Sequence, residues 1–192
     1  MIAPMDGVRR TNFWTIFAAS ILAIACIALF ARQARVTGLP LRDFAEYWAA
    51  GRLISAGENP YDPARIGHLE QAAGRDGDGL LMWNPPWTIP FTIPFGFLPP
   101  HTAHALWLLL QFITIAMSAT AIWRFYGGSY EHRGRVWLAT FTFAPVFLTL
   151  YLGQITAFLL AGAVLFLVLE RQGNDLAAGV VTLLLAIKPH LF

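Results

Sequence analysis

The stretch "TAHALWLLLQFITIAMSATAIW", residues 102–123, decides the fold class, because its 22 residues include no Asp, Glu, Lys or Arg. About 20 consecutive apolar residues are enough to cross a membrane as one α-helix. The whole chain has 192 residues, of which 57% are hydrophobic and only 12% are charged. A soluble domain of this size is much less apolar. We therefore expect an all-α polytopic membrane protein.

A second uncharged run, residues 11–31, has Arg9 and Arg10 before it and Arg32 and Arg35 after it. Its 21 residues are long enough to span the membrane, so we predict the first spanning helix here. A cleaved signal peptide is the competing interpretation, because it also has a basic start and an apolar core. The run is too long for such a core, and no small-x-small cleavage site follows it promptly.

The third uncharged run, residues 136–169, is too long to be one straight helix. Its 34 residues would extend about 50 Å, whereas the hydrocarbon core is about 30 Å thick. We predict two spans, residues 136–152 and 155–169, that meet near "YLGQ". A further span is expected at residues 176–192, after the turn "ERQGND".

The chain ends inside this last apolar segment, with "LLLAIKPHLF". We therefore expect the N-terminal part of a longer protein, with residues 1–192 forming a single membrane domain. The formal net charge of +2 comes without any dense cluster of basic residues, so we expect no nucleic-acid partner.

Residues 32–100 form the longest stretch without a predicted span, and we expect an outer loop followed by an interfacial segment. Helical patterns run from about residue 41 to 56 and from 63 to 73. The segment "WNPPWTIPFTIPFGFLPP", residues 83–100, contains six prolines, which argue against a regular helix. We predict an interfacial or re-entrant segment that packs on the helices.

The short loop at residues 124–135 contains three arginines, which places it in the cytoplasm by the positive-inside rule. Alternation of the spans then puts residues 32–100, the "YLGQ" turn and the end of the last span on the outer face. This convergence of polar groups requires the run at 136–169 to be two spans.

The outer loop begins with "LRDFAEYWAAGRLISAGENPYD", residues 41–62. On a helix, Phe44, Tyr47 and Trp48 share one face, Glu46 points the other way and Asp43 lies at the border. This pattern predicts an amphipathic helix on the membrane surface with its aromatic residues toward the lipid. A carboxylate at that boundary can serve as general base on a hydroxyl group. The alternative is that Asp43 caps the helix.

Four motifs in this order resemble glycosyltransferase family 87: "DFAEYWAAGRLISAGENPYD" at 43–62, "NPPWTIPFTIPFGFLPP" at 84–100, "YLGQ" at 151–154 and "KPH" at 188–190. The resemblance covers most of the chain from about residue 41 onward. It implies an inverting enzyme of the GT-C type in the bacterial cytoplasmic membrane, with several spans and an outward-facing site. It also implies a polyprenyl-phosphate sugar as donor and no required metal or cofactor.

The resemblance implies that Asp43 is the catalytic base, because the base of GT-C enzymes is an acidic residue in the first outer loop. A lysine at membrane depth costs free energy and is therefore expected to have a function. Lys188 is our candidate to stabilise the leaving phosphate. The alternative is that Lys188 extends its charged end to the membrane interface and binds no specific partner. The other substrate-binding candidates are His190, Arg52, Gln154 and Glu46. Glu46 either raises the proton affinity of Asp43 by like-charge repulsion or is a solvated surface residue.

The expected function is transfer of a hexose or pentose, with mannose favoured, to a glycolipid or glycan acceptor. Membrane lipids are the remaining expected partner. Two rival functions stay open: a polytopic transporter, and another polymerase or ligase of polyprenyl-linked glycans. A transporter predicts polar residues along its spanning helices, and these helices are nearly bare of them.

Overall fold

The computed structural model describes residues 40–189, and in this part of the chain helices joined by turns are the regular secondary structure, without a strand. The predicted first span at 11–31 lies outside these residues. The α-helices are α2 (Phe44–Ser55), α3 (Pro63–Ala72), α4 (Ile89–Gly96), α5 (Pro100–Phe125), α6 (Arg133–Thr142), α7 (Ala144–Leu152), α8 (Thr156–Arg171) and α9 (Asp175–Leu185). Two short 3₁₀ helices, η1 (Pro86–Thr88) and η2 (Tyr130–His132), precede α4 and α6.

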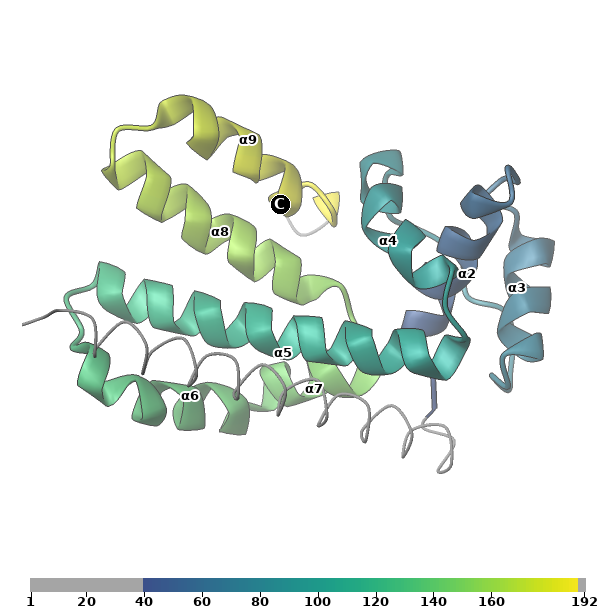
Figure 1. Cartoon of the computed structure of the whole chain (residues 1–192), viewed down its shortest axis with the longest axis horizontal. Helices are drawn as coiled ribbons and strands as arrows, with labels where there is room; N and C mark the ends of the chain where they lie inside the picture. The colour runs from purple at the N-terminus through teal and green to yellow at the C-terminus, as the bar shows by residue number, and fades with distance from the viewer. Residues whose placement is uncertain (1–39, 190–192) are drawn as a thin grey trace, which may run out of the picture.

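The long helix α5 organises the fold, as Figure 1 shows. The hairpin of α8 and α9 lies along one side of α5, and α6 and α7 lie along another. The shorter helices α2, α3 and α4 gather at the end of α5 where that helix begins. The N-terminal end of α5 is therefore surrounded by segments from several parts of the chain.

Within residues 40–189, α5 is the helix that is long and apolar enough to cross a membrane. The helices Tyr130–Thr142 and Ala144–Leu152 meet at a bend of 67°. They form a second crossing if the bent pair counts as one span. The helices α8 and α9 have 16 and 11 residues. The structure thus supports one or two spans by length and composition, and the other predicted spans stay predictions.

The uncharged run at 136–169 does bend near "YLGQ", as predicted, but it also breaks once more. The second break follows α6, at Phe143, so the predicted helix 136–152 is two helices. Pro145 explains it, because its ring excludes the carbonyl that a continuous helix would bring there. At the predicted bend, Gly153 ends α7 with φ at +70°, a left-handed conformation that favours glycine.

The proline-rich segment contains a regular helix, so the expectation of no helix there was wrong. Pro90 lies in the first turn of α4, where backbone N–H groups have no partner within the helix in any case. Pro94 therefore removes only one internal hydrogen bond from this helix. The predicted packing of the segment on other helices is confirmed, because α4 contacts α2 and α5.

The aromatic face of α2 packs against protein, so the prediction that it faces lipid was wrong. Phe44, Tyr47 and Trp48 are all buried. The fully buried Trp107 of α5 contacts two of them, with ring centroids 5.6 Å from Phe44 and 5.5 Å from Tyr47. Phe95 of α4 meets the same indole edge to face at 5.1 Å. Surface patterning alone had assigned this face to lipid because lipid and a protein core select the same residues.

Helices α2 and α4 cross at two glycines, Gly51 and Gly96. A Cβ atom added at Gly51 would overlap the carbonyl group of Thr92, and one added at Gly96 would overlap the backbone at Gly51. The crossing therefore has no room for a side chain at either position.

We predict that Gly51→Ala lowers the free energy of unfolding by about 1–3 kcal/mol, because overpacking forces the two backbones apart. The matched control is Gly134→Ala in α6, where an added Cβ meets nothing within 4 Å. Thermal unfolding of the detergent-solubilised protein measures both. Equal unfolding temperatures for the two variants would contradict the close crossing.

Candidate functional site

The polar side chains singled out from the sequence meet at a pocket of about 600 Å³. It lies where the start of α2, the turn after α7 and the chain after α9 come together. The polar residues in its wall are Asp43, Glu46, Tyr47, Asn84, Gln154 and Lys188. Leu80, Leu81 and Trp83 complete the wall. Six residues were expected at the site from the sequence alone. Four of these candidates lie in the pocket wall: Asp43, Glu46, Gln154 and Lys188.

Asp43 occupies the N-cap position of α2, but its side chain makes no capping hydrogen bond. The carboxylate instead accepts a hydrogen bond from the side-chain amide of Gln154. The backbone N–H of Asp43 donates to the carbonyl of Leu152 at 3.1 Å, which ties the start of α2 to the end of α7. The capping alternative therefore finds no hydrogen bond to support it.

Gln154 is held in place by the turn that precedes it. The indole N–H of Trp107 donates to the carbonyl of Gly153 at 2.8 Å, so α5 anchors this turn. A Cβ atom added at Gly153 would lie 2.9 Å from Cβ of Phe44, which shows how closely the turn approaches α2. The side chain of Gln154 therefore starts from a fixed backbone.

Lys188 completes a hydrogen-bonded chain, because its ammonium group donates to Oε1 of Gln154. The amide of Gln154 thus turns its acceptor to a cation and its donor to the carboxylate of Asp43. This is the orientation that the two charges favour. The three hydrogen-bonded residues come from the start of α2, from the turn after α7 and from the segment after α9.

Glu46 is buried beside this chain, with only 8% of its surface exposed, so the alternative of a solvated surface residue was wrong. Burial is the main cause that raises the pKa of Glu46 to about 8. The negative charges of Asp43 and Glu70 act in the same direction. A hydrogen bond with Tyr47 and the charge of Lys188 act against it. Glu46 is therefore mostly protonated at neutral pH.

Of the two remaining candidates the structure describes Arg52, which is not in the pocket wall. Arg52 is exposed and donates to the carbonyl of Gly96 at 3.2 Å, on the side of α2 that crosses α4. His190 lies outside residues 40–189. Within those residues, no group of three or more His, Cys, Asp or Glu side chains is placed to hold a metal ion.

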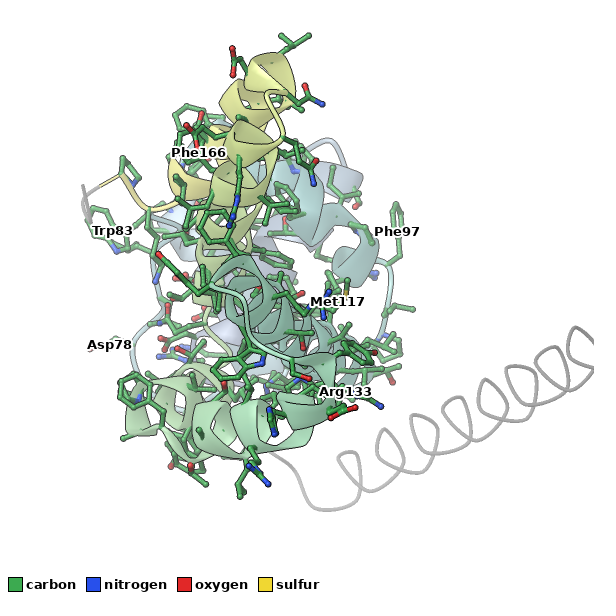
Figure 2. The ribbon with its side chains drawn as sticks, turned by 90° about the vertical axis from the view of Figure 1, so that its left-hand side faces the viewer. Asp78, Trp83, Phe97, Met117, Arg133 and Phe166 are labelled. Atoms are coloured by element: carbon green, nitrogen blue, oxygen red, sulfur yellow. The ribbon has the colours of Figure 1, made fainter. Side chains whose placement is uncertain are left out.

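Asn84 is one of two polar residues of the pocket wall, with Tyr47, that sequence reasoning did not place in the site. It is buried, and its backbone carbonyl accepts a hydrogen bond from the hydroxyl of Tyr61 at 2.9 Å. In the sequence its motif, "NPPW", indicates an interrupted helix and a family resemblance, and neither marks Asn84 as a pocket residue. Next to it, Trp83 lies at the edge of the molecule with 78% of its surface exposed (Figure 2).

Comparison with known proteins gives one finding about the family. The model of glycosyltransferase family 87 matches residues 83–192, which include Asn84, Gln154 and Lys188. The match begins after α2, so the assignment of Asp43 depends on the geometry of the pocket. No curated protein and no solved structure gives a significant match.

We predict that the raised pKa of Glu46 makes the protein less stable as pH rises. Between pH 4.5 and about 8 the unfolded chain releases this proton while the folded protein keeps it. The contribution of Glu46 to the free energy of unfolding therefore falls across this window. Glu46→Gln removes the titration and should flatten that dependence, as measured by thermal unfolding at pH 4.5 and pH 8. The same slope in both proteins would show that Glu46 does not retain its proton.

Proposed function

The chain belongs to glycosyltransferase family 87, and from this membership we propose that its pocket transfers a sugar from a polyprenyl-phosphate donor to a glycolipid or glycan hydroxyl. Membership makes the protein a membrane-associated glycosyltransferase with a donor and an acceptor. We favour mannose as the sugar, and we place the reaction at the outer face of a bacterial cytoplasmic membrane.

The observation that carries this proposal is the hydrogen-bonded chain of Asp43, Gln154 and Lys188 in one pocket. Sugar transfer needs a base for the attacking hydroxyl and positive charge for the departing phosphate. The carboxylate and the ammonium group meet these two needs, and the amide between them keeps them apart. A directly paired carboxylate and ammonium would satisfy each other instead.

In the proposed reaction, Asp43 takes the proton from the acceptor hydroxyl. That oxygen attacks the anomeric carbon from the face opposite the phosphate, and the bond between this carbon and the phosphate oxygen breaks. The configuration at the carbon is inverted, and polyprenyl phosphate leaves with the bonding electrons. Lys188 stabilises the negative charge that develops on the leaving oxygen.

Two further features of the pocket agree with a lipid-linked sugar. Glu46, protonated at neutral pH, is able to donate a hydrogen bond to a sugar hydroxyl. Leu81 and Trp83 expose apolar surface at the wall of the pocket, which suits the first part of a prenyl chain.

We also propose a GT-C-type topology with the pocket outside. The pocket residue Gln154 follows Gly153, which Trp107 binds near the beginning of α5, and the arginine-containing loop at 124–135 follows the end of that helix. A helix of 26 residues separates these two ends by about 39 Å, enough to cross the hydrocarbon core. A cytoplasmic loop would then put the pocket on the outer side. Residues 155–169 and 176–192 are proposed as further spans.

We predict that Asp43→Asn abolishes sugar transfer while the protein stays folded, because the amide cannot accept the proton. Transfer of radiolabelled sugar from polyprenyl-phosphate mannose and polyprenyl-phosphate arabinose to membrane glycolipids measures this. The control is Asp62→Asn, which makes the same change at the capping residue of α3. Turnover retained in the Asp43 variant would remove it from the role of base, and no transfer by the unaltered protein would favour a transporter or another polyprenyl-linked enzyme.

For Lys188 we predict that replacement by alanine raises the KM for the polyprenyl-phosphate donor, because the phosphate loses its cation. The expected rise is about tenfold, as for loss of a charge-assisted hydrogen bond. Arg65→Ala, which removes an exposed cation that pairs with Glu58, serves as the control. An unchanged donor KM would leave Lys188 as an interfacial charge.

A further inference from the structure

The backbone that leads into Lys188 is held by side chains from a distant segment. Asn84 donates from its amide nitrogen to the carbonyl of Ile187 at 3.0 Å. Trp87 donates from its indole nitrogen to the carbonyl of Ala186 at 3.3 Å. Both carbonyls lie just beyond the end of α9, where a helix leaves carbonyl groups without partners of its own.

The bond from Asn84 acts on the peptide unit that carries Lys188. The carbonyl of Ile187 and the backbone nitrogen of Lys188 belong to one planar peptide group. A hydrogen bond that fixes the carbonyl therefore fixes the plane from which Lys188 departs. Pro189 restricts the backbone of Lys188 from the other side.

Asn84 is itself held firmly enough to serve this purpose. It is 5% exposed, and the hydroxyl of Tyr61 donates to its backbone carbonyl. The backbone N–H of Tyr61 is in turn bound by the side chain of Asn59 at 3.0 Å. Pro85 follows Asn84 and limits its backbone to extended conformations. Contacts from the outer loop and from the proline-rich segment thus hold the side-chain amide of Asn84 in place.

We propose that Asn84 is a positioning residue that aims the ammonium group of Lys188 at Gln154 and hence at the donor phosphate. This inference rests on the proposed role of Lys188 in donor binding. Asn84 reaches the reaction only through Lys188, so its effect must disappear when Lys188 is absent.

The test is a double-mutant cycle in the intact protein, with the KM for polyprenyl-phosphate mannose as the readout. Asn84→Leu keeps the approximate shape and removes the donor nitrogen that faces the carbonyl, without adding a charge to the pocket. We expect it to raise the donor KM about fivefold in the unaltered background and to add nothing in the Lys188→Ala background. Gln71→Leu is the control, since Gln71 is exposed in α3 and is not part of the pocket wall.

An equal rise in both backgrounds, or no rise in either, would overturn the inference. If Asn84→Leu does not fold, Trp87→Phe removes the neighbouring donor at a partly exposed position. It should raise the donor KM in the same way and only when Lys188 is present.

A second readout does not require activity. The rate at which an amine-reactive reagent labels Lys188, followed by mass spectrometry, should rise about fivefold in Asn84→Leu because the amine is no longer held. An unchanged labelling rate would refute the positioning role. A faster labelling rate, together with a donor KM that stays the same in Lys188→Ala, would instead refute the proposed function. It would leave the positioning of Lys188 by Asn84 intact.

Discussion

The hydrogen bond from the indole of Trp107 to the carbonyl of Gly153 is the contact on which the rest of the site depends. It fixes the turn after α7 against α5. Directly before this turn, the carbonyl of Leu152 accepts a hydrogen bond from the backbone N–H of Asp43. One turn thereby sets the position of Gln154 and of the carboxylate that Gln154 binds. Only a left-handed glycine that nearly touches α2 allows this approach.

The charges of the pocket form a balanced arrangement. Burial keeps a proton on Glu46 at neutral pH, so Asp43 is the acidic side chain left to balance Lys188 in the pocket wall. A second carboxylate would compete for Lys188 and repel a phosphate. The neutral form of Glu46 thus suits the anionic donor that we propose, and Gln154 keeps the two opposite charges separate.

The sequence predicted the parts of this fold that depend on local pattern. The length of α5 and the bend at Gly153 follow from uncharged runs and a glycine. It did not predict the burial of Glu46 or the helix α4, because both result from packing between segments distant in the chain. Asn84 was missed for the same reason: its partner, Ile187, is 103 residues away, and no local pattern marks it.

The link between Asp43 and Lys188 is tested most directly by Gln154→Leu in the intact protein. Sugar transfer and donor affinity are measured together, with the exposed Gln71→Leu of α3 as the control. The account predicts that the Gln154 variant stays folded but loses at least about tenfold in both quantities, because a charged hydrogen bond is lost on each side. Transfer and affinity equal to those of the unaltered protein would contradict the claim that this chain of three residues forms the active site.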